Sequence, residues 1–144
     1  MLISEQKPDL RLINPLTLAF VGDGVYEMLA REEVVFRHTS LSAKKLHILT
    51  VELVRATAQC RGCEAIKDEL TEEEMNIFKR GRNANGVTAP KSTSAAEYRV
   101  ATGVEALFGW LYLSGQGERI RQLFQMILNG ECDAEQKPDD LEQD

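Results

Sequence analysis

The chain has 144 residues, of which 43% are hydrophobic and 28% charged, and its formal net charge is −6. This length predicts one domain with a real core, and the apolar content excludes a disordered chain. No apolar run approaches the roughly 18 residues that a membrane span needs, and the N-terminal residues lack the layout of a signal peptide. Three cysteines are too few and odd in number for a disulfide framework, which favours a reducing, cytoplasmic setting.

The negative charge is concentrated at one end of the chain. Residues 131–144 hold seven acids against one lysine, whereas residues 75–99 hold five basic residues against one acid. We expect residues 131–144 to be an acidic, disordered tail outside the folded domain. The overall charge therefore does not exclude nucleic acid as a partner of residues 10–130.

The periodicity of apolar residues is helical almost throughout, and the sequence needs no strand. Asn14 and Pro15 are a typical helix start, because asparagine caps free amide groups and proline tolerates the first turn. Thr71 and Glu74 form a capping box that opens another helix. The predicted fold is all-α, one domain of about six helices, over residues 15–36, about 42–61, 63–70, 71–80, 94–114 and 117–129, with a loop at 81–93.

Two acids lie in apolar surroundings. Asp23 is flanked by Gly22 and Gly24 inside the first helix, and Glu105 is the only charged residue in the segment 100–115. Burying a carboxylate costs several kcal/mol (~3 or more) unless it is paired or binds a metal. Each acid alone could form a structural ion pair, but together they favour a shared site for Mg²⁺ or Mn²⁺. The glycines suggest that another backbone or a ligand comes close.

A second candidate site is basic. Positive charge and neutral donors flank the glycine-containing loop, with no acid between them, and such groups suit phosphate oxygens. A solvated basic loop is the competing interpretation. The loop leads directly into the helix that carries Glu105, which favours a phosphodiester hydrolase. The candidate phosphate-binding residues are Lys79, Arg80, Arg82, Asn83 and Lys91.

Three further patterns are weaker. Glu27 lies one turn after Asp23 and could be a third ligand or a surface acid. Cys60 and Cys63 have the spacing of a redox motif, but no strand precedes them, and we interpret them as incidental. The acids Glu69, Glu72, Glu73 and Glu74 could form the metal cluster of an all-helical nucleotide pyrophosphohydrolase, although they fit better as a capping box and first-turn partners of the helix dipole.

Two segments resemble the helix signatures of the ribonuclease III catalytic domain. They are residues 18–25 (LAFVGDGV) and residues 104–109 (VEALFG). The resemblance is closest to Mini-ribonuclease III, a short branch of that family without a double-stranded-RNA-binding domain. It covers residues 10–130 and includes, in order, the motifs 79–84 (KRGRNA), 88–91 (TAPK) and 98–99 (YR).

This resemblance implies a helical, homodimeric, Mg²⁺-dependent endonuclease that cuts double-stranded RNA. For the short branch it implies maturation of the ends of 23S ribosomal RNA precursor in a bacterial cytoplasm. Asp23 and Glu105 are expected to be the metal-binding catalytic acids. The broader family carries two more acids, at the places that Ala19 and Thr102 occupy here, so a catalytically weak RNA-binding module of the same fold stays an alternative.

Overall fold

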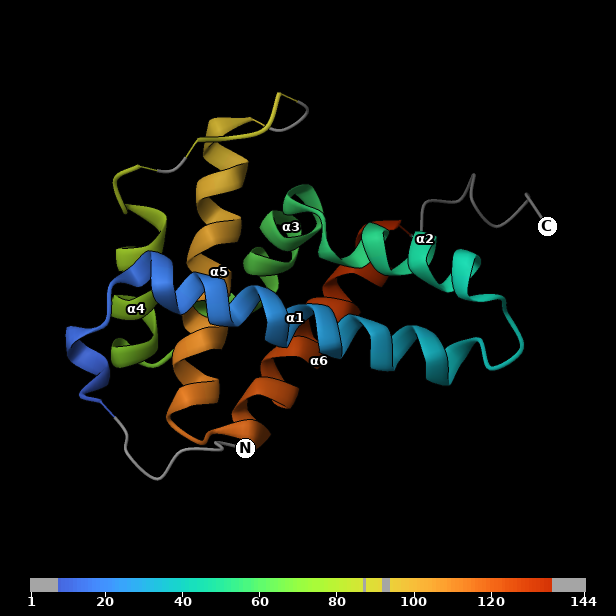
Figure 1. The fold of residues 1–144 in the computed structure, drawn as a ribbon, viewed down its shortest axis with the longest axis horizontal. Helices are drawn as coiled ribbons and strands as arrows, with labels where there is room; N and C mark the ends of the chain where they lie inside the picture. The colour runs from blue at the N-terminus through green and yellow to red at the C-terminus, as the bar shows by residue number, and fades with distance from the viewer. Residues whose placement is uncertain (1–7, 87, 92–93, 136–144) are drawn as a thin grey trace.

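The structure is a computed structural model that describes residues 8–86, 88–91 and 94–135. Six α-helices and two short 3-10 turns make up the ordered elements of these residues, and no strand occurs among them. This confirms the all-α prediction. The elements are η1 (Leu10–Leu12), α1 (Pro15–Arg37), α2 (Ala43–Val54), α3 (Ala56–Ile66), η2 (Lys67–Glu69), α4 (Glu72–Arg82), α5 (Ala95–Leu113) and α6 (Gly117–Glu135) (Figure 1).

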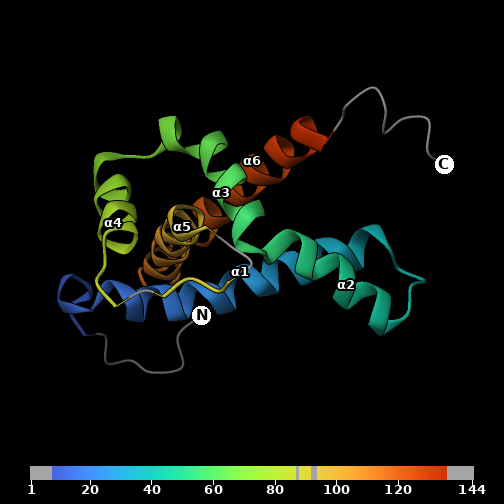
Figure 2. The same ribbon diagram turned by 90° about the horizontal axis from the view of Figure 1, so that it is seen from above.

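Helix α5 is the centre of the fold. It packs against α1, α3, α4 and α6, and ten of its residues are buried. Figures 1 and 2 show α4 along one flank of α5 and α1 running across it. Tyr26 of α1 fills the space between α5 and α6, where its ring meets those of Phe108 and Phe124 edge to face at 5.4 and 5.3 Å. These aromatic contacts join three helices into one core.

The crossing of α1 and α5 depends on two glycines. A Cβ atom at Gly22 would lie 1.6 Å from the backbone oxygen of Glu105, and one at Gly109 would lie 1.9 Å from the backbone oxygen of Leu18. Any side chain at either position would force the helices apart. The expected close approach of a second backbone is thus confirmed at Gly22, whereas a Cβ at Gly24 would meet no atom within 4 Å.

The segment after α1 differs from the sequence-based expectation. One helix was predicted up to Gly62, but the chain turns at Arg55, whose extended backbone (φ −62°, ψ 151°) separates α2 from α3. Gly62 lies inside α3 because α6 packs there, and a Cβ at Gly62 would lie 2.4 Å from the Ile127 side chain. The separate helix predicted over 63–70 is therefore wrong, and these residues form the end of α3 and η2.

Two other helix ends also differ. Helix α4 continues to Arg82, because Gly81 packs closely on Ala106 of α5, and the connecting loop begins at Asn83 rather than at residue 81. Helix α6 continues to Glu135 instead of ending at Asn129. The first five residues of the predicted tail are thus helical, and residues 136–144 lie outside the described part of the chain.

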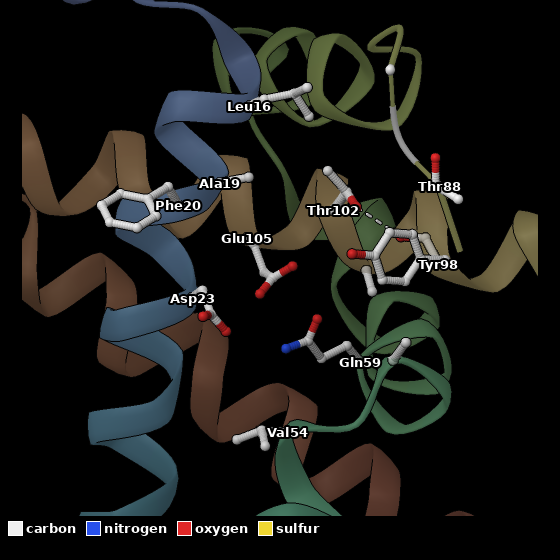
Figure 3. A pocket seen from close by; sticks show the side chains of 13 residues that line it. Leu16, Ala19, Phe20, Asp23, Val54, Gln59, Thr88, Tyr98, Thr102 and Glu105 are labelled. Carbon is white, nitrogen blue, oxygen red and sulfur yellow. Dashed lines mark hydrogen bonds between the residues drawn. The ribbon is translucent and has the colours of Figure 1, made fainter. Parts of the chain in front are cut away.

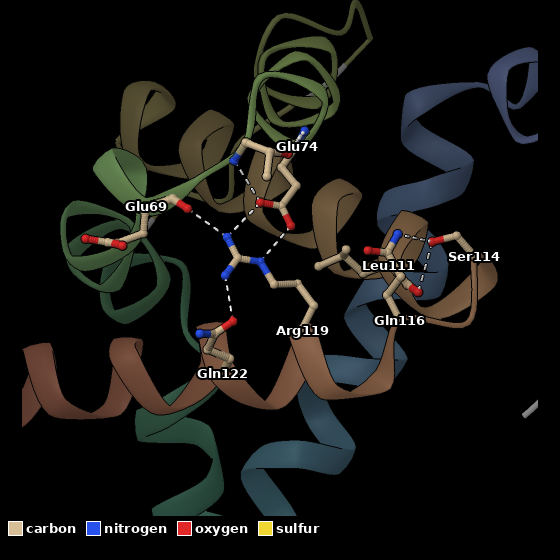
Figure 4. A network of polar contacts seen from close by, with 8 residues as sticks. Glu69, Glu74, Leu111, Ser114, Gln116, Arg119 and Gln122 are labelled. Carbon is tan, nitrogen blue, oxygen red and sulfur yellow. Dashed lines mark hydrogen bonds and ion pairs between the residues drawn. The ribbon is translucent and has the colours of Figure 1, made fainter.

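A buried ion pair fixes α4 on α6. The capping box of Thr71 and Glu74 forms as predicted, and the Glu74 carboxylate, with 3% of the residue exposed, also accepts two hydrogen bonds of 2.8 Å from Arg119. The same guanidinium donates to the Glu69 carbonyl oxygen at 2.7 Å (Figure 4). Arg119 lowers the pKa of Glu74, so this carboxylate stays charged within the fold.

Helices α1 and α2 form a hairpin that extends beyond the rest of the bundle. Both views show α2 beside the C-terminal half of α1, on the side away from α4. Only Thr50 of α2 is buried, so α2 adds little to the core. No helix among the described residues is long and apolar enough to cross a membrane.

Candidate active site

The structure brings Asp23 and Glu105 together. Asp23 follows the Gly22 contact on α1, and Glu105 lies at the same crossing on α5, so the backbone approach of the two helices places the carboxyl groups side by side. Their side chains are in hydrogen-bond contact with each other. Figure 3 shows both acids pointing into one open pocket, whose volume is about 630 Å³.

The pocket is built from four parts of the chain. Helix α1 and helix α5 supply the acids, the turn at Arg55 places Val54 and Ala56 along one side, and the loop after α4 contributes Gly86 and Thr88. The polar lining is Asp23, Gln59, Thr88, Tyr98, Thr102 and Glu105. Ala19 and Thr102, which occupy the places of the broader family's extra acids, line this same pocket. The Thr102 hydroxyl donates to the Tyr98 carbonyl oxygen at 2.9 Å.

The surroundings of Glu105 favour its neutral form. Burial, together with the hydrogen bond and negative charge of Asp23, raises the pKa of Glu105 to about 8. Between its ordinary pKa of 4.5 and about 8, Glu105 therefore keeps a proton that a free glutamate would lose. Two adjacent carboxyl groups that share a proton are a site where a cation can replace that proton.

The donor set fits a divalent hard cation. Two carboxylates supply the oxygen ligands that Mg²⁺ and Mn²⁺ prefer, and Mg²⁺ commonly keeps several waters beside one or two protein carboxylates. No group of three or more His, Cys, Asp or Glu side chains around a common point occurs among the described residues. Glu27 does not join the acid pair, because its carboxylate accepts a hydrogen bond from Arg31 at 3.0 Å.

The five candidate phosphate-binding residues lie outside the pocket. Lys79, Arg80 and Arg82 are at the C-terminal end of α4, Asn83 caps that helix, and Lys91 is exposed in the loop. Other residues of this loop, Gly86 and Thr88, do reach the pocket, so the basic segment leads to its rim.

Both arginines among these five residues have partners within the protein. Arg80 donates to the Ile13 carbonyl oxygen at 3.3 Å, which ties α4 to the residues before α1. The Arg82 guanidinium lies 5.5 Å from the centre of the Phe78 ring and donates to the Asn83 side-chain oxygen at 3.3 Å. These contacts hold both groups in place, and both side chains remain at least partly accessible.

Sequence reasoning missed Gln59 and Tyr98. Tyr98 belongs to the YR motif but was given no place in the site. Gln59 has a signal in its helical spacing, since Ala58, Gln59, Gly62, Cys63 and Ile66 form the buried face of α3. An amide on an otherwise apolar face is the kind of buried polar group that calls for a partner.

The cysteine pair and the cluster of four acids do not form functional sites. Burial raises the pKa of the Cys63 thiol to about 11 and also raises that of Cys60, which keeps both thiols protonated and argues against a redox pair. Among the four acids of the alternative metal cluster, Glu74 is bound to Arg119. That cluster, and with it the pyrophosphohydrolase interpretation, finds no support in the described residues.

Comparisons with known proteins identify the family of the chain. The family model of the ribonuclease III domain matches residues 16–116. A Mini-ribonuclease 3 of Clostridium tetani is 40% identical over 85% of this chain and 82% of the relative. A Mini-ribonuclease 3 of Symbiobacterium thermophilum is 44% identical over 78% of this chain and 86% of its own.

A solved structure extends the likeness to three dimensions. The crystal structure of a Fusobacterium nucleatum protein superposes with a TM-score of 0.76 at 30% identity, covering 88% of this chain and 99% of that one. Sequence and fold thus agree over the region that contains both signature helices. The chain belongs to the ribonuclease III family and is an endoribonuclease of that type.

Proposed function

We propose that this chain is a Mg²⁺-dependent endoribonuclease, able to use Mn²⁺, that cleaves double-stranded RNA as a homodimer in the cytoplasm. Its proposed substrate is the 23S ribosomal RNA precursor, which the resemblance to Mini-ribonuclease III implies. The observation that carries the proposal is the contact between Asp23 and Glu105 in an open pocket.

In this mechanism the acid pair holds the cation. Asp23 and Glu105 come from rigid helices that meet at Gly22, so their carboxyl oxygens are held in place before RNA arrives. Glu105 would release its proton to solvent if both carboxylates bound the cation. When held by these two residues, Mg²⁺ would supply an activated water and would stabilise charge on the leaving oxygen of the phosphodiester.

The basic segment holds the RNA. Lys79, Arg80, Arg82, Asn83 and Lys91 carry the positive charge and donors that contact backbone phosphates, and the loop between them borders the acid pair. Duplex RNA is recognised mainly by its shape, its phosphates and its 2′-hydroxyls, which such contacts serve without reading sequence.

The homodimer is proposed to form through one face of α1. Met28, which is 65% exposed, lines an apolar groove together with Val21, Val25 and Tyr112. Phe20, which is 81% exposed, precedes Val21 on the same helix. We call Phe20, Val21, Val25 and Met28 the α1 stripe. Apolar surface of this kind favours burial against a second copy, and because Phe20 also lines the acid pocket, each copy would approach the other's site.

Cleavage of duplex RNA tests the proposal directly. The wild-type chain with Mg²⁺ should cut a double-stranded substrate, and Asp23→Asn should reduce the rate by at least ~100-fold because one ligand charge is lost. Glu27→Gln is the matched control, since it removes a surface acid from the same helix. If Asp23→Asn cuts like the wild type, the assignment of the acid pair is wrong.

The choice of substrate needs its own comparison. We expect precursor 23S RNA, with its terminal stems paired, to be cut at discrete positions and faster than a random duplex of equal length. Equal rates and scattered cuts would remove the ribosomal precursor from the proposal. Binding of duplex RNA without any cleavage in Mg²⁺ or Mn²⁺ would favour the non-catalytic module.

A further inference from the structure

The Gln59 side chain is a buried amide that faces the acid pair. Gln59 lies in the first turns of α3, where the chain has just turned at Arg55, and only 2% of the residue is exposed. It lines the same pocket as Asp23 and Glu105. In Figure 3 its carboxamide points from α3 into the space in front of the two carboxyl groups.

This amide has no partner in the described part of the chain. None of the described residues forms a hydrogen bond with the Gln59 side chain, and no fully enclosed side-chain nitrogen or oxygen among them lacks a partner, so the amide atoms of Gln59 are open to the pocket. Its neighbours on the buried face of α3 are apolar or small, and a leucine would fill the same place without polar atoms. A carboxamide has two donors and a carbonyl oxygen with two lone pairs, and buried groups of this kind are normally satisfied.

The depth of Gln59 limits what its partner can be. A side chain with 2% exposure cannot meet an RNA backbone or base, but a water molecule or an ion that enters the pocket can reach it. The amide is also neutral, so it adds an oxygen ligand or a hydrogen bond without adding a third negative charge to Asp23 and Glu105.

We propose that Gln59 is the third protein group of the cation site, and that its amide holds the cation bound by Asp23 and Glu105 in position, directly through its oxygen or through a coordinated water. This inference rests on the proposed function, because it requires the acid pair to bind a divalent cation. Gln59 thereby takes over part of the work that additional acids at the places of Ala19 and Thr102 would do. We class it as a positioning residue.

Binding of Mn²⁺ to the RNA-free chain, followed by electron paramagnetic resonance, is the test. Gln59→Leu should weaken Mn²⁺ binding by about tenfold, the size of effect seen when supporting groups around a metal are removed. Its melting temperature without metal should stay the same or rise, because an amide that has no protein partner and faces the pocket is replaced by an apolar group of similar size. Gln125→Leu, which removes an exposed amide on α6, should change neither property.

A second variant should change the affinity for Mn²⁺ in the opposite direction. Gln59→Glu places a third carboxylate in the pocket and should strengthen Mn²⁺ binding, while it lowers the melting temperature of the metal-free chain through repulsion between like charges. Added Mn²⁺ should therefore raise the melting temperature of Gln59→Glu more than that of the wild type.

The outcomes separate this inference from the proposed function. If Asp23→Asn loses Mn²⁺ and Gln59→Leu binds it like the wild type, Gln59 has no role at the cation and the inference fails alone. If neither variant changes Mn²⁺ binding, the acid pair is not the metal site and both fail. A third outcome also overturns the inference. If Gln59→Leu lowers the stability of the metal-free chain and Gln59→Glu does not bind Mn²⁺ more tightly, Gln59 serves only the packing of the fold.

Discussion

At the scale of single residues, Glu105 combines two opposing requirements. Its helix must be apolar to form the centre of the bundle, and residues on both sides of Glu105 are fully buried, among them Val104 and Ala106. The carboxyl group must nevertheless be available beside Asp23. The pKa of about 8 is a consequence of these two requirements, because burial favours the neutral form of Glu105. A cation can bind this carboxyl group only after its proton has left.

We therefore predict that Glu105→Gln stabilises the metal-free chain at neutral and higher pH. The folded-state pKa of Glu105 is raised from 4.5 to about 8, so the folded chain binds more protons than the unfolded chain within this window. Stability from this group is present at low pH and is lost as the pH rises through the window. A glutamine does not titrate, and its advantage should reach about 1–3 kcal/mol near pH ~8.5.

Urea unfolding in the presence of a chelator measures this effect. The two chains should have similar free energies of unfolding at pH ~5 and should diverge as the pH increases. Glu27→Gln, which removes a solvent-facing acid bound to Arg31, serves as the control and should show no such divergence. A constant difference between Glu105→Gln and wild type at all pH values would contradict the raised pKa.

At the scale of secondary-structure elements, the contact between α1 and α5 sets the geometry of the site. Gly22→Ala would place a methyl group 1.6 Å from the Glu105 backbone oxygen, and neither backbone can yield without separating the helices. We expect a loss of at least about 3 kcal/mol in the free energy of unfolding. Gly24→Ala, two residues away with no atom within 4 Å, should be neutral or stabilising by up to about 1 kcal/mol.

Circular dichroism of the two variants during thermal or urea unfolding checks this pair, at one fixed protein concentration. Equal effects of Gly22→Ala and Gly24→Ala would mean that helix propensity, rather than the close approach of the backbones, explains both glycines. A folded Gly22→Ala chain should also lose activity, because the crossing that places Asp23 beside Glu105 is widened.

Features set by nearby residues were predictable from the sequence. The helix starts at Asn14 and Thr71 follow from side chains that cap the first turn, and both caps form. The acid pair was predictable because a charged residue in an apolar helix is anomalous, and the structure places the two anomalies together. The signal for each of these features lies in a few neighbouring residues, although the pairing of the two acids depends on the crossing of α1 and α5.

Features set by distant residues were not predictable. No local property of Arg55 requires an extended backbone. The chain turns at Arg55 because α2 packs along α1, whereas α3 packs on α5 and α6. Gly62 is typical of a helix end, yet it serves the contact with Ile127. Gln59 faces the pocket only as a result of that turn, so its helical spacing marks it as a buried amide but does not place it in the site.

At the scale of the whole molecule, the α1 stripe bears on assembly. Met28→Glu places a charge on an apolar side chain that is 65% exposed in the single chain, and it should weaken the proposed dimer by at least about tenfold. Ile48→Glu is the matched control, since Ile48 is 53% exposed but lies on α2, outside the stripe. Sedimentation velocity over a range of protein concentrations compares the two variants. Dimers that survive Met28→Glu and dissociate with Ile48→Glu would move the interface to α2.

The distribution of charge over the molecule leads to the last prediction. The loop that borders the pocket follows the basic end of α4, whereas α2 carries the separate basic pair Lys44 and Lys45 on the hairpin away from α4. If RNA lies across the pocket, its phosphates contact the basic end of α4 and the loop that follows, and they do not contact Lys44 and Lys45. Lys79→Ala combined with Lys91→Ala should then weaken duplex RNA binding and flatten its dependence on salt concentration, by about one unit of logarithmic slope per lost contact.

Binding is measured in the Asp23→Asn background, so that the RNA stays intact, at several salt concentrations. Lys44→Ala combined with Lys45→Ala removes the same charge from the hairpin and isolates the effect of position from that of net charge. It should lower the affinity slightly and leave the slope unchanged, because a distant charge acts through the general field and releases no counterion from the RNA. Equal slopes for the two double variants would mean that the loop is not the phosphate-binding face, and the RNA path would then have to cross the hairpin as well.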